Sequence, residues 1–433
     1  MKKILFVSLA VILALSVGLV GCGGGGGGGG GTTGSTKIVI GMSRSLTGSL
    51  AVVHSSAFGA IYPTYINMTN TAGGIPIGNK TFQVEAKVLN DNSEAGKLQT
   101  HITALTNDVE DGDVHTIFGP TCTYFIDLAA PICNDADVVL MTAEGGATFL
   151  ESPGYLPDWP YVFITLSFSD WYQLPVLAPL LNGAGATSAY IFWQNDAHGL
   201  EYLATAGAVF PGAGITLVGN ASVLATDPGF NPAALLAAAN ATNPDVVCVF
   251  AYPGEIMALT GTAIGLGYQF DAWCTGPGAN FGWFKDAFGP GSEAGVICFA
   301  VANNKTSPAM ANLFNSVFAG GVVAGQDFWG HPLYWAAMQI WQAAVTAVGA
   351  QADDGNFVIN QTALKNKLAS YNSPGTGVTT CLGTTYYTMF GTGGGILAYQ
   401  CHTGEVGQWQ SGYVEVIGGN NVTSSIVYPK PNW

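Results

Sequence analysis

The sequence predicts an α/β protein of two lobes, each built on a parallel sheet with helices on both faces. Short apolar runs typical of buried strands alternate with helix-like segments from Lys37 to Gly145. The same alternation restarts at Tyr190 and continues to Gly278. In addition, 433 residues exceed the size at which one hydrophobic core keeps growing. Two similar lobes are therefore expected.

The first strand is expected at Ile38, Val39 and Ile40, after a leader rich in Gly, Ser and Thr. The loop after it carries Arg44 and Ser45, at a strand's carboxyl end where open α/β sheets bind ligands. Arg44 is the only arginine of the chain. Its planar, permanently charged side chain suits a carboxylate or similar anion. An ion pair with a nearby acid is the alternative.

The remaining elements of the first half continue the strand and helix alternation. Three more strands are expected at residues 82–89, 115–118 and 138–141. Helices are expected at residues 55–71 and 94–107, with another between the last two strands.

The second half repeats this pattern and then ends in a different one. Strands are expected at residues 190–193, 215–218, 246–250 and 272–274, and helices from Leu200, at 232–240 and from Glu255. A long apolar helix is expected at residues 329–349, and a hairpin at 384–400 around three glycines.

Composition excludes several classes of function. With 9% charged residues, 48% apolar residues and a formal net charge of −15, the chain resembles neither a disordered nor a nucleic-acid-binding protein. The sequence has no GxSxG, HExxH or P-loop motif, and its six histidines are scattered. We therefore expect a binding protein without catalysis, cofactor or metal.

Residues 1–21 have the layout of a signal peptide. Two lysines precede an apolar run, which ends in Leu19-Val20-Gly21-Cys22. This ending resembles a bacterial lipobox, which implies cleavage before Cys22 and a lipid on its sulfur. An uncleaved membrane anchor is the alternative. Residues 22–36, rich in glycine, are expected to be a flexible tether.

Seven cysteines remain after Cys22, so at least one thiol stays unpaired within a monomer. Disulfides could join Cys122 with Cys133 and Cys381 with Cys401. Cys248 and Cys298 lie in strand-like runs, where buried thiols are expected.

Several segments in order resemble the extracytoplasmic substrate-binding proteins of ABC importers, in the type I group typified by the branched-chain amino acid binders. The segments are IVIGMSRSLTG, NTAGGIPIGNKTFQV, VHTIFGP, PYVFITLSFSD, YIFWQNDAHG, NPDVVCVFAYPGE and WCTGPG. The resemblance implies a monomer with two Rossmann-like lobes that close over a ligand and deliver it to a membrane permease. It also implies three hinge crossovers, near Ile164, Ala302 and Val378. Lobe 1 would then comprise residues 37–164 and 303–378, and lobe 2 residues 165–302 and 379–433.

The resemblance also implies a ligand site shared by the two lobes. In the first lobe Cys122 and Thr123 match the loop that holds the ligand's carboxylate, and the adjacent loop matches at Thr142, Ala143 and Glu144. In the second lobe Tyr252 matches an aromatic residue that faces the ligand's ammonium group. The amino acid binders usually carry an acid where this chain has Gly278. Its absence disfavours a zwitterionic amino acid, unless Glu144 or Glu255 replaces it.

Aromatic residues near the expected cleft favour a flat or branched apolar ligand. They are Phe168, Trp171, Trp193, Tyr252, Phe281, Trp283 and Trp329, although core packing is the alternative, above all for Phe281 and Trp329. The ligand is therefore expected to be a small hydrophobic or aromatic carboxylate, with a branched-chain amino acid as the alternative. A sensor domain for a signalling receptor and an amide or ester hydrolase are the other functions considered.

Overall fold

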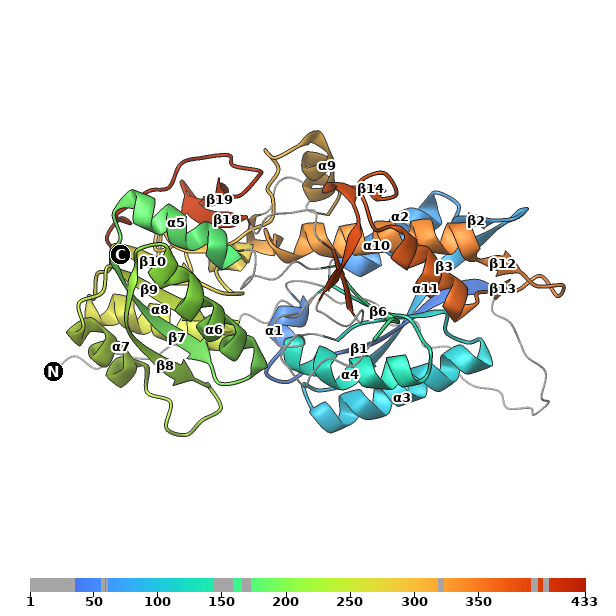
Figure 1. Cartoon of the computed structure of the whole chain (residues 1–433), viewed down its shortest axis with the longest axis horizontal. Coiled ribbons are helices and arrows are strands. Elements are labelled where there is room, and N and C mark those ends of the chain that lie inside the picture. Colours follow the sequence, from blue (N-terminus) through green and yellow to red (C-terminus); the bar gives the residue numbers. More distant parts are fainter. Residues whose placement is uncertain are drawn as a thin grey trace. The chain divides into compact units, whose positions relative to one another are not determined.

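The computed structural model describes residues 36–55, 59, 61–120, 122–143, 159–165, 173–317, 323–390, 396–399 and 405–433. Their strands form an eight-stranded sheet, a seven-stranded sheet and two small pairs. Helices pack on both large sheets (Figure 1). This mixed α/β architecture with mainly parallel sheets confirms the predicted fold class.

The first sheet is parallel in its centre and antiparallel at its edges. The strand order is β16-β17-β6-β5-β4-β1-β3-β2, with β2 antiparallel to β3 and β16 antiparallel to β17. Its strands are β1 (Lys37–Arg44), β2 (Ile75–Ile77), β3 (Lys80–Asn90), β4 (Thr116–Phe118), β5 (Leu140–Thr142), β6 (Val162–Ile164), β16 (Tyr387–Phe390) and β17 (Ile396–Tyr399). The predicted hairpin at 384–400 is confirmed as β16 and β17.

Two groups of helices accompany the first sheet (Figure 1). One group consists of α3 (Ala95–Asp111) and α4 (Thr123–Asp135), and the other of α2 (Ile61–Thr71), α10 (Gly330–Val348) and α11 (Gln361–Ser370). The short α1 (Ala51–Val53) follows β1. Small pairs are formed by β12 (Ala350–Gln351) with β13 (Phe357–Val358) and by β14 (Val378–Thr380) with β15 (Gly383–Thr385).

The start of α2 differs from the prediction for a local reason. A helix over residues 55–71 would place Pro63 in its interior, where proline removes a backbone hydrogen bond and clashes with the preceding turn. The helix instead begins at Ile61, so Pro63 lies in the first turn, where its missing N–H has no intrahelical partner to lose.

The second sheet has a parallel core and ends in an antiparallel hairpin. The strand order is β19-β18-β11-β10-β9-β7-β8, and β18 runs antiparallel to both of its neighbours. Its strands are β7 (Ser188–Gln194), β8 (Thr216–Val223), β9 (Val246–Phe250), β10 (Ala272–Thr275), β11 (Ile297–Phe299), β18 (Val406–Gln410) and β19 (Tyr413–Gly418). Its helices are α5 (Leu174–Ala184), α6 (Ala197–Gly212), α7 (Pro232–Ala241) and α8 (Pro253–Leu266), with α9 (Pro308–Val317) later in the chain.

The chain passes between the two sheets three times, and two of the passages lie later than expected. After Ala302 the chain stays with the second sheet: Asn303 donates to the Val414 carbonyl oxygen at 2.9 Å, and the Phe328 ring packs against Trp409. Only from Trp329 does it continue into α10, which packs on α2 and α11. The second passage therefore lies near Trp329 rather than Ala302.

The third passage is displaced in the same direction. Because β17 pairs with β6, and β16 with β17, both strands belong to the first sheet, and β18 belongs to the second. The chain thus leaves the first sheet after Tyr399 rather than near Val378. The expected boundaries depend on pairings between segments far apart in the chain.

The cysteines of the described residues are buried thiols, so the possible disulfide between Cys122 and Cys133 is not formed. These residues are Cys122, Cys133, Cys248, Cys274, Cys298 and Cys381. Cys122 caps α4 and Cys133 lies near its other end. Eleven helical residues span about 16 Å, too far for the roughly 7 Å limit between bridged Cα atoms. The Cys381 thiol donates instead to the Pro332 carbonyl oxygen at 3.3 Å. Its expected partner, Cys401, lies outside the described residues.

Within the part of the chain that the structure describes, no helix is both long and apolar enough to cross a membrane. The expected signal peptide, Cys22 and nearly all of the expected tether lie outside that part.

Candidate functional site

The loop after β1 is held by polar side chains from the end of β3. The fully buried Asp91 accepts hydrogen bonds from the Ser45 hydroxyl at 2.6 Å, the Ser43 hydroxyl at 3.3 Å and the Ser93 backbone N–H at 2.9 Å. These two serines flank Arg44 in the sequence. The carboxylate of Asp91 therefore fixes the backbone on both sides of Arg44, a role that the sequence analysis did not assign.

Gly48 closes this loop against the next one. Its φ is +90°, and a Cβ there would lie 2.2 Å from the Asn92 carbonyl oxygen. Only glycine fits a left-handed backbone in such close contact. Asn90 reinforces the loop, since its side-chain oxygen accepts from the Leu46 backbone N–H at 3.1 Å.

Arg44 is buried, and two of its hydrogen bonds go to neutral groups of the first lobe. It donates from Nη1 to the Gly119 carbonyl oxygen at 2.7 Å and from Nε to His54 Nδ1 at 3.4 Å. Burial, and then the Arg44 charge, lower the pKa of His54 to about 3, so the imidazole is a neutral acceptor. Arg44 thus connects β1 to the loop that leads into α4, and these two hydrogen bonds stabilise the fold.

Four predicted residues of the first lobe lie at the ends of two neighbouring strands. Cys122 is the N-cap of α4 and Thr123 its first residue, and both are buried. Thr142 ends β5, and Ala143 follows it. The two loops are close because a Cβ at Gly119 would lie 2.7 Å from Thr142 Cβ. Glu144 and Phe168 lie outside the described residues, so their predicted roles stay predictions.

The second lobe contributes Tyr252, which is the N-cap of α8 and follows β9. Its ring stacks on His198 of α6, with the ring centroids 5.0 Å apart and the planes inclined by 10°. Burial raises the pKa of the Tyr252 hydroxyl, and the neighbouring Cys122 and Asp196 raise it further. The interaction with Cys122 links the predicted residues of the first lobe to Tyr252 of the second.

Several buried polar atoms of the described residues lack a hydrogen bond of normal geometry, and four of them lie in this region. They are His198 Nε2, the Tyr252 hydroxyl, Thr275 Oγ1 and Trp329 Nε1. Three of these residues follow or end β7, β9 and β10, which are neighbours in the second sheet. A buried polar group left unpaired costs about 1–3 kcal/mol, so these atoms are candidates for hydrogen bonds to a ligand.

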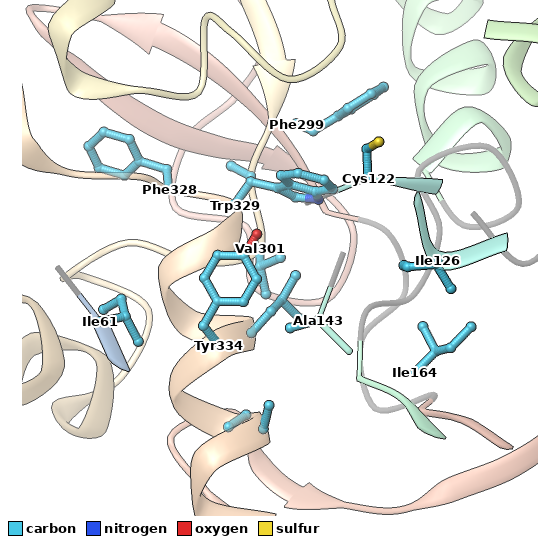
Figure 2. Packing of buried hydrophobic residues seen from close by; sticks show 14 of the residues in the cluster. Ile61, Cys122, Ile126, Ala143, Ile164, Phe299, Val301, Phe328, Trp329 and Tyr334 are labelled. Atoms are coloured by element: carbon cyan, nitrogen blue, oxygen red, sulfur yellow. The ribbon is translucent and has the colours of Figure 1, made fainter. Parts of the chain in front are cut away.

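Trp329 joins this group from the second passage between the sheets. Figure 2 shows its indole pointing toward Cys122, with Phe299 above and Ala143 below. Phe299 in turn stacks near Tyr202, which makes an edge contact with His198. The sequence analysis favoured core packing for Trp329. Its unpartnered N–H adds a polar function that only the fold reveals.

The available groups are mainly hydrogen-bond donors. Burial lowers the pKa of His198 to about 4, so its imidazole is neutral at physiological pH. Tyrosine, threonine and tryptophan each offer an O–H or N–H. Such a set suits a ligand that presents acceptor oxygens.

At Gly278, where the amino acid binders usually carry an acid, a neighbouring side chain takes up the space. A Cβ at Gly278 would lie 2.8 Å from Ile256 Cδ1, so an acidic side chain there requires Ile256 to move. Glu255, one proposed replacement, accepts from the Ala225 backbone N–H at 2.6 Å and from Gln194 Nε2 at 3.5 Å. It therefore holds the loop after β8.

The contacts of Trp193 do not connect it with the buried donors around Tyr252. The indole N–H donates to Asn220 of β8 at 3.1 Å. The next residue, Gln194, faces Tyr252 and Glu255 instead. Because side chains alternate along a strand, Trp193 points to the opposite face.

No metal centre is present among the described residues, and the cluster around Ser43 does not have the order of a hydrolase triad. No three His, Cys, Asp or Glu side chains there are placed to hold a metal ion. Ser43 lies between His101 at 3.2 Å and Asp91 at 3.3 Å. A catalytic triad needs the histidine between the serine and the acid, so this order does not activate the hydroxyl.

A family model described as periplasmic binding protein matches residues 37–387. The chain belongs to this family. Its relatives are solute-binding proteins rather than enzymes, which agrees with the expectation of binding without catalysis. No curated protein matches the sequence.

Solved structures of similar proteins share the fold of this family member. The branched-chain amino acid transporter substrate-binding protein LivJ from Streptococcus pneumoniae, in complex with isoleucine, is 18% identical with a TM-score of 0.69, covering 88% of this chain and 99% of its own. The leucine-binding protein LivK from Thermotoga maritima is 16% identical with a TM-score of 0.67, covering 89% and 99%. A solute-binding protein of an ABC transporter from R. palustris, in complex with benzoate, is 15% identical with a TM-score of 0.67, covering 90% and 98%.

Proposed function

We propose that this chain is the lipid-anchored solute-binding protein of an ABC importer and that it captures a small hydrophobic or aromatic carboxylate between its lobes. The observation that carries the proposal is the group of buried donors around Tyr252, His198, Thr275 and Trp329, which lack a hydrogen bond of normal geometry within the described residues. Acceptor oxygens of a carboxylate would satisfy them. Stacked aromatic rings beside them suit an apolar body.

The site also disfavours an α-amino acid as ligand. Gly278 stands where the amino acid binders usually have an acid, and Ile256 occupies the space that such a side chain would need. Glu255 is engaged with the backbone of a neighbouring loop. A buried ammonium without a counter-ion costs several kcal/mol. Benzoate in one relative of the same fold makes an aromatic carboxylate a reasonable class to test.

The lipid anchor and the tether complete the proposal. Cys22 would carry the lipid, and the glycine-rich segment after it would let the globular part reach a permease at the membrane. Labelled fatty acid incorporated by the full chain, and lost in Cys22→Ala, would support the anchor. Equal labelling of both would contradict it.

The experiment for the ligand is a thermal-shift panel on the full chain. The probes are benzoate, 4-methylpentanoate, leucine and isoleucine. A ligand at a hundred times its dissociation constant should add about 2.7 kcal/mol of stability. We expect a carboxylate without an amino group to raise the melting temperature most.

A pair of variants tests whether the site is the one described. Thr123→Val removes a buried hydroxyl but keeps the side-chain shape, and it should weaken the shift by roughly tenfold in affinity. Thr103→Val, on the exposed face of α3, is the matched control and should leave the shift unchanged. A shift with leucine and isoleucine alone would overturn the proposed ligand class. No shift with any probe, or equal effects of both variants, would overturn the proposed site.

A further inference from the structure

A single buried carboxylate joins the two sides of the second passage between the sheets. Asp327 Oδ1 accepts hydrogen bonds from Asn280 Nδ2 at 2.7 Å and from the backbone N–H groups of Trp329 at 3.0 Å and Gly330 at 2.9 Å. Asn280 belongs to the loop after β10, whereas Gly330 begins α10. Asp327 thus connects the second lobe to the helix that enters the first.

The backbone around Asp327 reinforces this connection. The Gly282 N–H donates to the Gln326 carbonyl oxygen at 2.7 Å, and the Phe328 N–H donates to the Asn280 carbonyl oxygen at 3.1 Å. Both bonds hold the segment before Trp329 to the second lobe. The bonds from Trp329 and Gly330 to the carboxylate are therefore placed where a hinge motion would bend the chain.

The other oxygen of Asp327 is enclosed. Oδ2 is buried and makes no hydrogen bond within the described residues. A Cβ at Gly330 would lie 2.3 Å from it and 2.8 Å from the Tyr334 ring, so glycine is required for the close approach. The exposed fraction of Asp327 is 0%. In this conformation its carboxyl group therefore has no contact with water.

The titratable groups facing Asp327 come from two elements. Cys298 lies on β11, and His331 and Tyr334 lie on the first turns of α10. Burial raises the pKa of Asp327 to about 7, although the three hydrogen bonds oppose this rise. A conformation that exposed Asp327 to water would return its pKa to the ordinary value near 4.

We propose that Asp327 is a positioning residue that latches the second passage and makes the opening of the lobes depend on a proton. The proposal rests on the proposed function, since lobe closure is the motion that the latch controls. Rising pH favours the conformation that exposes the carboxylate, in which Trp329 and Gly330 lose their acceptor. Closure would then take up a proton, and its equilibrium constant would fall tenfold per pH unit between the ordinary and the raised pKa.

The test measures lobe separation without any ligand. Spin labels are attached at Tyr124→Cys in α4 and Leu200→Cys in α6, two exposed positions on helices that contact each other across the lobes. The full chain without these substitutions is labelled in parallel as the background. We expect the distance between the labels to be longer at pH 8.5 than at pH 5.5.

Asp327→Asn keeps the Oδ1 acceptor but cannot ionise, so its labels should stay at the short distance at both pH values. Asp353→Asn, in the exposed turn between β12 and β13, is the matched control and should behave as the parent. A parent distance that does not change with pH overturns the latch. A change that Asp327→Asn retains also overturns it. Because this experiment uses no ligand, its result stands even if no probe of the thermal-shift panel binds. If a probe binds but the distance between the labels does not change with pH, the latch is overturned and the proposed function is not.

Discussion

Asp91→Ala tests how the loop around Arg44 is positioned. The substitution removes the acceptor of the buried Ser45 hydroxyl at 2.6 Å and of the Ser93 backbone N–H at 2.9 Å. Ser43 can turn to His101, which is 3.2 Å away, and so loses less. At about 1–3 kcal/mol for each of these two groups left unpaired, the free energy of unfolding should fall by about 2–6 kcal/mol.

Urea denaturation of the full chain measures this loss from the midpoint at an unchanged slope. Asp91→Asn keeps one acceptor oxygen and should lose less than half as much. Asp108→Ala is the control, since it breaks only a surface pair with Lys87 and should cost no more than about 1 kcal/mol. A loss for Asp91→Ala as small as that of Asp108→Ala would refute the positioning role.

Three further predictions concern stability. Burial lowers the pKa of His115 from 6.5 to about 4. Between these two pH values His115 is protonated in the unfolded chain but neutral in the folded chain, so the free energy of unfolding falls as the pH drops from 6.5 to 4. Between pH 7 and 4.5, His115→Gln should lose about 2 kcal/mol less than the parent in urea denaturation, and equal losses would contradict this. Gly48→Ala should lower the melting temperature more than Gly112→Ala, because both have positive φ but only Gly48 has atoms within 4 Å of the added Cβ. Trp341→Phe should cost about 2–4 kcal/mol in urea, since it leaves a cavity and removes the hydrogen bond to Thr116 at 3.1 Å, whereas a loss under 1 kcal/mol would contradict the packing.

Segments buried on both faces were predictable from local sequence alone. The predicted strand at 246–250 has the same bounds as β9, because five consecutive apolar residues are all buried. The helix expected at 329–349 differs from α10 by one residue at each end. In both cases the apolar pattern and the burial agree.

The lobe boundaries were not predictable in the same way. Residues 303–317 and 323–328 stay with the second lobe through contacts such as that of Asn303 with Val414, more than a hundred positions later. The hairpin of β18 and β19 was not predicted, although it completes the second sheet. No local pattern encodes which sheet a late strand joins.

The ligand-binding roles of the predicted site residues stay predictions, and the structure shows only where some of these residues lie. The loops of Cys122, Thr142 and Tyr252 were expected to meet, and Cys122 and Tyr252 interact. Arg44 was expected to face a ligand, whereas two of its donors serve the protein itself. The unpartnered N–H of Trp329 depends on long-range packing, so its sequence neighbourhood gave no sign of it.

The three passages between the sheets have a consequence for folding. The first sheet needs β17, which lies more than three hundred and fifty positions after β1, and the second sheet needs β18 and β19 from the end of the chain. Neither lobe can finish before nearly the whole polypeptide is available. Pairings between such distant segments form slowly. The pairing of β17 with β6 and of β18 with β11 is therefore expected to be among the last steps of folding.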